Sequence, residues 1–408
     1  MNGSEPILAI DIGTTKVCGL LAIIGEEERP EIVGVGLAPS TGLYRGAVVD
    51  LDVTTNAVRE AVNQVFSTPS GVRRRQAVVG IAGGFIRSYN GHGSVVVNNR
   101  SRGVTSHDIQ AAIRDAVQKE VPSEMEVIHA LPREFRLDDT AGVRDPLGMQ
   151  GTLLEVDLHL VAGLRSALRN VKRAVRNAGL RVEGLALEPL ASSLAVLTEE
   201  EKSAGVAMVD IGGGTTDLAV FTDGLIRHSE VILVGGDYIT KDLSKAFVTP
   251  FERAEALKLR FAAASADTGQ PGEQVDIQRA RKSQMTCVSR QQFNWVVEAR
   301  VEQILGEVKR SLGDRFFCDQ LGGGVVLTGG TALLEGIREK ATTCLEREVE
   351  IGFPDGVGGY DEIIRNPIYS TAIGLIHYGL AERKRRHVGR SPWRVPWDWF
   401  ARFLQDNF

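Results

Sequence analysis

The 408-residue chain is poor in cysteine and in aromatic residues, and it contains no long uninterrupted apolar run. Its four cysteines form no Cys-x-x-Cys pair, which argues against a disulfide scaffold and against a zinc site. The absence of about 18 consecutive apolar residues argues against a membrane-spanning helix. The first residues lack a basic segment followed by a long apolar core, so we expect no signal peptide.

Neither sign of charge dominates the chain as a whole. The 47 Lys and Arg residues and 52 Asp and Glu residues give a net charge of −5, which argues against a nucleic-acid-binding function. The distribution is uneven, because residues 383–408 hold seven basic and two acidic residues and so carry +5. Residues 1–382 therefore carry −5 − 5 = −10. A basic tail on an acidic body indicates a separate role for the tail.

The tail also holds three of the four tryptophans. Residues 383–391 predict a basic linker, and residues 392–408 predict a helix, with Pro396 suited to its first turn. In a helix that turns by about 100° per residue, the large apolar side chains of this segment fall on one arc. Such a helix could pack on the body, but its aromatic face and basic linker favour the interface of an anionic membrane. The residues expected to bind the membrane are Trp393, Trp397, Trp399, Phe400, Phe403, Leu404 and Phe408.

Two segments of the body share one pattern, in which two apolar strands flank a turn rich in glycine and threonine. Residues 7–24 read ILAIDIGTTKVCGLLAII and residues 206–221 read VAMVDIGGGTTDLAVF, with Asp11 and Asp210 at equivalent places. A third β-rich run and a helical segment follow each hairpin. The repeat predicts an α/β fold of two related lobes, and the cleft between them is the expected ligand site.

The residue types in these turns together point to a phosphate ligand and a divalent cation, although either turn taken alone is more typical of a plain tight hairpin. Glycine lets the backbone approach an anion, threonine hydroxyls donate hydrogen bonds, and Lys16 adds a positive charge. Asp11 and Asp210 suit Mg²⁺ held through water molecules. Residues 325–335 predict a strand, a Gly-Gly turn and a helix, which adds backbone N–H groups. The candidate nucleotide-binding residues are Gly13, Thr14, Thr15, Lys16, Gly212, Gly213, Gly214, Thr215, Thr216, Gly235, Gly236, Gly329 and Gly330.

Together these motifs resemble the phosphate and adenosine motifs of the actin, sugar kinase and Hsp70 superfamily. Within it, the chain resembles the FtsA family of actin-like bacterial cell-division proteins from Ile7 to about Glu382. The resemblance implies ATP and Mg²⁺ between the lobes. It also implies that Glu255 and Lys258 face the nucleotide, although they could form a surface ion pair instead. Glu188 would position the attacking water in a slow ATPase, or it could be a charge favoured at the start of a helix.

Residues 84–162 predict a separate α+β insert, with strand-like runs around an amphipathic helix at 106–120. This insert resembles the subdomain that the FtsA family carries where actin and MreB have a different one. The first lobe core is then expected at 5–83, 163–204 and 371–382. The second lobe core is expected at 205–250 and 319–370, and the tip of the second lobe at 251–318.

The resemblance also implies partners. In the FtsA family the second-lobe tip receives the C-terminal peptide of FtsZ, and the insert contacts neighbouring subunits and later division proteins. Arg300, Lys309 and Arg310 are the candidates for peptide contact, although for any one of them a solvated helix face is the simpler explanation. The implied function is an ATP-binding, self-assembling protein that tethers FtsZ filaments to the inner face of the cytoplasmic membrane at the division septum.

Three other functions share the superfamily fold. The aromatic tail argues against a pilus-assembly adaptor of the PilM type. The first lobe offers no convincing aspartate base or acceptor pocket for a sugar or small-molecule kinase. The 26 residues after position 382 are too few for the substrate-binding domain of an Hsp70-like chaperone.

Overall fold

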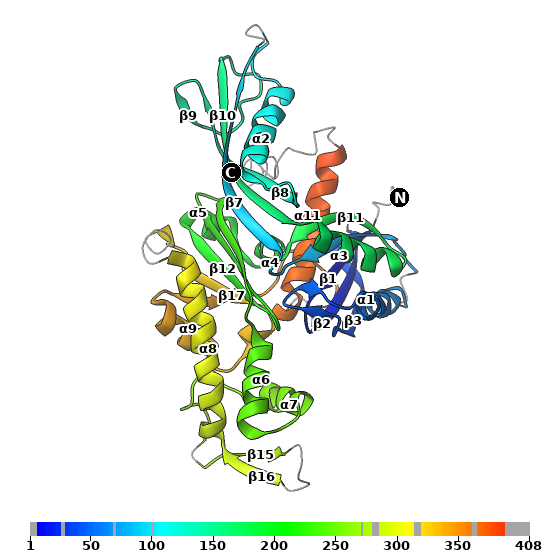
Figure 1. Ribbon diagram of the computed structural model, residues 1–408, viewed down its shortest axis with the longest axis vertical. Coiled ribbons are helices and arrows are strands. Elements are labelled where there is room, and N and C mark those ends of the chain that lie inside the picture. The colour runs from blue at the N-terminus through cyan, green and yellow to red at the C-terminus, as the bar shows by residue number, and fades with distance from the viewer. Residues whose placement is uncertain are drawn as a thin grey trace.

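The computed structural model describes residues 6–25, 29–67, 71–98, 102–270, 272–279, 285–313, 320–360 and 365–387. Strands in these ranges form two five-stranded sheets, one four-stranded sheet and two short ribbons. Figure 1 shows an elongated molecule, with the four-stranded sheet at one end and the ribbon β15 (Gln274–Gln278) and β16 (Met285–Ser289) at the other. No helix in the described ranges combines the length and the hydropathy needed to cross a bilayer.

The first lobe is built on a mixed five-stranded sheet with the order β11-β6-β1-β2-β3. Its strands are β1 (Ile7–Ile12), β2 (Lys16–Ile24), β3 (Pro30–Pro39), β6 (Gln76–Ile81) and β11 (Arg181–Leu187). Strands β1 and β3 each pair with β2 in antiparallel orientation, whereas β6 lies parallel to both β1 and β11. All six residues of β1 are buried, as expected for a central strand that is covered on both faces.

The second lobe repeats this topology in the order β14-β13-β12-β17-β18. Its strands are β12 (Val206–Ile211), β13 (Thr216–Thr222), β14 (Leu225–Ile232), β17 (Val325–Thr328) and β18 (Val349–Ile351). Strands β12 to β14 are antiparallel, and β17 lies parallel to both β12 and β18. The repeated hairpin pattern of the sequence therefore corresponds to two sheets of the same topology, and the predicted two-lobed α/β fold is confirmed.

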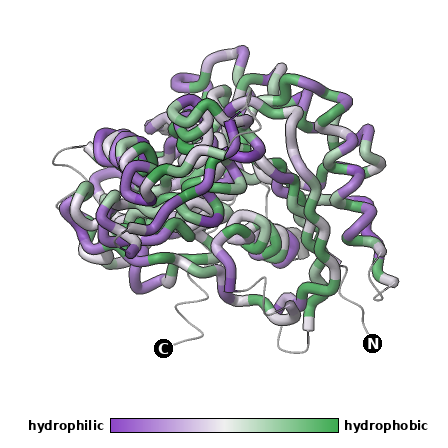
Figure 2. The backbone as a smooth tube through the Cα atoms, turned by 90° about the horizontal axis from the view of Figure 1, so that it is seen from below, coloured by the Kyte–Doolittle hydropathy of each residue, from purple (hydrophilic) through white to green (hydrophobic). Residues whose placement is uncertain are grey.

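Helices cover both faces of the first sheet. One face packs against α1 (Leu51–Phe66) and α3 (Arg165–Asn177), and the other against α4 (Glu188–Val196) and α11 (Ser370–His387). Figure 2 shows hydropathy alternating along several helices at the surface, as expected for helices that bury one face. Helix α11 continues to His387, so the basic segment predicted to begin as a linker at 383 begins as helix instead. The membrane-helix prediction for 392–408 lies outside the described residues.

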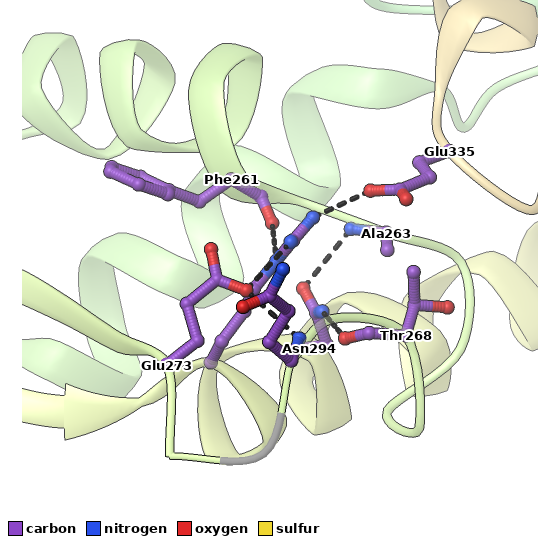
Figure 3. Close-up of polar contacts among 8 residues, drawn as sticks. Phe261, Ala263, Thr268, Glu273, Asn294 and Glu335 are labelled. Atoms are coloured by element: carbon purple, nitrogen blue, oxygen red, sulfur yellow. Dashed lines mark hydrogen bonds and ion pairs between the residues drawn. The ribbon is translucent and has the colours of Figure 1, made fainter.

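The second lobe packs its sheet against α6 (Gly236–Phe247), α7 (Phe251–Phe261), α8 (Arg290–Leu312) and α9 (Ile337–Leu345). Polar contacts join the end of α7 and the start of α8 to neighbouring loop residues, as Figure 3 shows. Arg290 donates to the carbonyl of Phe261 at 3.1 Å and pairs with Glu273 at 2.9 Å. Asn294 is buried, and its amide oxygen accepts from the N–H of Ala263 at 3.0 Å.

Short elements complete the two lobes. Strands β4 (Leu43–Tyr44) and β5 (Ala47–Val48) form a ribbon before α1, and α5 (Glu199–Ala204) precedes β12. The 3₁₀ turns are η3 (Gly330–Leu333) and η4 (Pro367–Tyr369).

The insert is a four-stranded antiparallel sheet with one helix and its own apolar core. Its elements are β7 (Ile86–Val96), α2 (Ser106–Glu120), β8 (Met125–Leu137), β9 (Thr140–Val143) and β10 (Leu153–Leu164). Helix α2 packs so closely that a Cβ on Gly93 would lie 2.0 Å from the carbonyl oxygen of Ala112. The short strand β9 was not predicted from the sequence.

The insert also contacts the second lobe along β14. The Ser88 hydroxyl donates to the carbonyl oxygen of Ser229 at 2.6 Å, and His159 Nε2 lies 2.8 Å from the Ser229 hydroxyl oxygen. Arg133 Nε donates to the carbonyl of Ile226 at 3.2 Å. Burial and the nearby Arg227 lower the pKa of Arg133 to about 10. The insert therefore bridges the lobe from which it emerges and the edge strand of the other.

Candidate functional site

The two repeated hairpins meet turn to turn at the junction of the lobes. A Cβ on Gly213 would lie 1.8 Å from Thr15 Oγ1, and a Cβ on Gly214 would lie 2.4 Å from Thr14 Oγ1. A side chain at either position would collide with the threonines of the opposite lobe in this arrangement of the lobes. The structure thus brings the predicted first-lobe and second-lobe turn residues into direct contact.

The segment before α6 supports the second-lobe turn from behind. The N–H of Gly236 donates to the carbonyl of Gly212 at 2.9 Å, and the N–H of Asp237 donates to that of Gly213 at 2.8 Å. Position 235 has no room for a side chain, since a Cβ there would lie 2.6 Å from the Gly212 carbonyl oxygen. Thr15 Oγ1 lies 3.5 Å from Asp237 Oδ1, which adds a polar contact between the lobes.

The Gly-Gly turn after β17 lies against the same group of residues. Gly329 has φ +85°, and a Cβ there would lie 2.2 Å from Asp210 Oδ1. The hydroxyl of Thr331, in the next turn of chain, donates to the carbonyl of Gly212 at 3.4 Å. The expected helix start differs, because Gly330 opens the one-turn 3₁₀ helix η3, and α9 follows only at Ile337.

Glu255 and Lys258 lie one turn apart on α7 and form an ion pair at 2.7 Å. The Lys258 ammonium also donates to the carbonyl of Gly236 at 3.3 Å, and Glu255 accepts a hydrogen bond from Thr240 of α6. The pair therefore joins α7 to the start of α6, next to the second-lobe turn. Thr216 does not join this group, because its buried hydroxyl donates to the carbonyl of Val234 in its own lobe at 2.8 Å.

Four buried carboxyl groups lie beneath the turns, on Asp11, Glu188, Asp210 and Asp217. Burial raises the pKa of Asp11 to about 6, with Lys16 opposing the shift and Asp210 adding to it. Burial and the neighbouring carboxylates raise the pKa of Glu188 and Asp217 well above their ordinary values. Repulsion between neighbouring carboxylates therefore adds to the effect of burial on these pKa values.

Helices α4 and α11 hold the second-lobe aspartate in place. Asp210 accepts hydrogen bonds from the Ser192 hydroxyl at 2.7 Å and from the Thr371 hydroxyl at 3.1 Å. Burial raises the pKa of Asp210, and these two hydrogen bonds oppose the increase. Ser192 and Thr371 were not predicted as site residues, since only the folded chain brings two isolated hydroxyls to this carboxylate.

Asp217 was also missed, although the sequence contained a signal for it. It pairs with Asp210 across the β12–β13 hairpin, as Cys18 pairs with Asp11 across β1–β2. Its Oδ2 accepts from the Thr215 hydroxyl at 3.2 Å, whereas its buried Oδ1 has no hydrogen-bond partner among the described residues. An acidic residue that ends a glycine-threonine turn is the signal that could have identified it.

The carboxyl groups and the lysine at the junction are of the residue types that suit a site for Mg²⁺ and phosphate. Four buried carboxyl groups lie near a single ammonium group, that of Lys16, and Asp217 Oδ1 has no hydrogen-bond partner among the described residues. Within the described ranges, no three His, Cys, Asp or Glu side chains converge as direct metal ligands. Asp11 and Asp210 are carboxylates, the ligand type through which Mg²⁺ is commonly held while it keeps several of its waters.

The three basic residues predicted for peptide contact are already paired. Arg300 pairs with Asp242 of α6 at 2.5 Å, and Lys309 pairs with Glu346 at 2.8 Å. Arg310 pairs with Glu307 one turn away on α8. They therefore form three separate surface pairs rather than one open cluster.

Comparison with solved structures defines the class of fold. The PilM-PilN type IV pilus biogenesis complex superposes with a TM-score of 0.67 at 19% identity, covering 92% of this chain and 98% of that chain. MreB 5 of Spiroplasma citri bound to AMPPNP gives a TM-score of 0.58 at 16% identity, covering 95% and 99%. The chain therefore has an actin-like fold, with two lobes that meet at paired glycine-threonine turns.

Sequence comparisons identify the family. Residues 207–374 match the model of "Cell division protein FtsA", and residues 83–162 match the model of the "SHS2 domain inserted in FTSA". Cell division protein FtsA of Pseudomonas aeruginosa is 40% identical over 383 residues, 94% of this chain and 91% of the relative. The Bacillus subtilis protein is 35% identical over 395 residues, 96% and 87%. The chain belongs to the FtsA family and is an actin-like cell-division protein, as the sequence motifs predicted; the alternative functions are not favoured.

Proposed function

We propose that the chain binds ATP with Mg²⁺ where the two hairpins meet. The observation that carries this proposal is the contact of two equivalent glycine-threonine turns above four buried carboxyl groups. Thr14, Thr15 and Lys16 would hold the phosphates from the first lobe, together with the backbone of 212–215 from the second. Asp11 and Asp210 would hold Mg²⁺ through its waters. The cation would neutralise the negative charge of these carboxylates.

The adenosine part would lie toward α6, α7 and the turn after β17. Gly235, Gly236, Gly329 and Gly330 permit close backbone approach there, and the Glu255–Lys258 pair lies against the same backbone. The threonines of one hairpin touch the glycines of the other, so a triphosphate between the turns requires the lobes to separate. Nucleotide would thereby set the angle between the lobes, and with it self-assembly into actin-like filaments.

Hydrolysis, if it occurs, is expected to be slow. Glu188 is the candidate to position the attacking water, and its side chain lies buried at the start of α4. Burial and three neighbouring aspartates raise the pKa of Glu188 well above its ordinary value, which favours the protonated form at neutral pH. A protonated carboxyl group is a poor general base.

Isothermal titration calorimetry tests the nucleotide proposal. Asp210→Ala is expected to weaken Mg-ATP binding at least tenfold, because it removes the second-lobe carboxylate that faces the turns. The exposed Asp139→Ala serves as the control and is expected to bind like wild type. Equal affinity of the Asp210→Ala and Asp139→Ala variants would overturn the assignment.

We further propose that residues 392–408 anchor the chain to the inner face of the cytoplasmic membrane at the division septum. The tail carries three tryptophans and follows a basic segment, which supports binding to anionic lipids. There the chain would tether FtsZ filaments by binding the FtsZ C-terminal peptide at the second-lobe tip. Trp295 of α8 is 56% exposed and offers an apolar anchor for such a peptide, while the insert would face later division proteins.

Two binding measurements test this part. The full-length chain is expected to sediment with vesicles containing anionic lipid, whereas a 1–390 truncation stays in the supernatant; equal pelleting would end the tether proposal. A fluorescent FtsZ C-terminal peptide is expected to lose affinity for Lys309→Ala/Arg310→Ala. Unchanged binding by this variant would remove those side chains from the peptide site.

A further inference from the structure

Helix α3 carries a continuous stripe of positive charge on the surface of the first lobe. Its 13 residues include five basic side chains and no acidic one. At about 100° per residue, all five fall within one arc of about 100° beside the buried stripe that contains Leu168 and Val175. We call this set the basic stripe, and its members are Arg165, Arg169, Lys172, Arg173 and Arg176.

Little of this charge is neutralised. Lys172 pairs with Glu126 at 2.7 Å, but in the part of the chain that the structure describes no ion pair involves the four arginines of the stripe. Arg165, Arg169 and Arg176 donate to neutral carbonyl groups, at 3.0, 3.2 and 3.3 Å. Like charges four residues apart destabilise a helix. An anionic partner would remove this repulsion, so the stripe is suited to bind one.

The C-terminal end of the stripe lies toward the sheet edge that Arg383 of α11 also reaches, although α3 and α11 cover opposite faces of that sheet. Helix α3 leads into β11, the edge strand of the first sheet, and the N–H of Arg181 in β11 donates to the carbonyl of Arg75 at 2.6 Å. Arg383 of α11 lies at the same edge, because it donates to the carbonyl of Pro6 at 2.7 Å and lies 3.7 Å from Glu183 of β11.

We propose that the basic stripe is a second membrane-contact surface, which binds anionic lipid headgroups while residues 392–408 insert into the same bilayer. This inference rests on the proposed role of the tail. A lipid surface is favoured over other polyanions because the stripe is straight, about 17 Å long, and close to the edge from which the tryptophan-rich tail continues. Two linked contacts with one surface reinforce each other. The stripe would also determine which side of the first lobe faces the membrane.

The test measures binding of full-length protein to vesicles of phosphatidylcholine with 0, 20 or 40% phosphatidylglycerol. The variant Arg173→Gln/Arg176→Gln removes two exposed charges and keeps good helix formers. Arg253→Gln/Arg260→Gln removes two exposed charges from α7 in the other lobe and is the matched control. A third variant, Arg173→Lys/Arg176→Lys, restores the charge without the guanidinium groups.

The stripe variant is expected to bind about tenfold more weakly at 40% phosphatidylglycerol and like wild type without anionic lipid. The lysine variant should recover most of the affinity. Equal vesicle affinity of the stripe variant and the α7 control overturns the proposal. So does a stripe variant that binds vesicles like wild type but binds a duplex oligonucleotide more weakly. A 1–390 chain that pellets like the full-length chain would instead refute the tail anchor, so the two failures are distinguishable.

Discussion

Asp11 offers a sharp test of the site, because its buried charge should cost stability when no nucleotide is bound. Burial raises its pKa from 3.8 to about 6. The folded state therefore holds the proton more tightly than the unfolded state, and stability falls as the pH rises from about 4 to about 6. Each pKa unit corresponds to about 1.36 kcal/mol, so the cost above pH 6 is about 3 kcal/mol.

Asp11→Asn removes this cost and is expected to stabilise the nucleotide-free protein at pH 7.5 by about 1–3 kcal/mol. Urea unfolding at pH 5.0 and pH 7.5 measures the effect, and the gain should be smaller at pH 5.0. The same variant should lose the stabilisation that Mg-ATP gives to wild type. The exposed Asp139→Asn is the control. A variant that is less stable than wild type at pH 7.5, or a gain that does not change with pH, would refute the reasoning.

Three further predictions concern the contacts around the site. Ser192→Ala removes a 2.7 Å hydrogen bond to Asp210 and should weaken Mg-ATP binding several-fold by calorimetry; unchanged affinity would show that this bond does not orient the carboxylate. Gly214→Ala places a Cβ against Thr14 and should destabilise the nucleotide-free protein by about 1–3 kcal/mol in urea unfolding, whereas an unaffected midpoint would mean that the turns do not touch. Arg133→Ala should speed hydrogen exchange in β14 and in the insert, and unchanged exchange would contradict the bridge between them.

The sequence predicted the lobes well because the information about them is local. An apolar strand, a glycine-threonine turn and a second apolar strand specify a hairpin within about 15 residues, and the chain contains that pattern twice. The helical segments expected after the two hairpins are α1 and α6. Helix α2 begins and ends where predicted, and Thr105 and Asp108 form its capping box.

The contacts that the sequence did not reveal are those between distant segments. Ser192 and Thr371 reach Asp210 from helices that are unremarkable in pattern, and Arg133 reaches β14 from the insert. Basic residues 383–387 looked like a linker because of their charge, yet Lys and Arg are good helix formers and simply extend α11. Charge indicated solvent exposure there but did not indicate the backbone conformation.

Reconstitution on vesicles tests the central claim, that this chain links FtsZ filaments to a membrane. Fluorescent FtsZ polymers are mixed with vesicles containing anionic lipid, in the presence of Mg-ATP and either the full-length chain or the 1–390 truncation. The account predicts that FtsZ coats the vesicles only with the full-length chain. Equal coating with the truncation, or no coating with either chain, would contradict it.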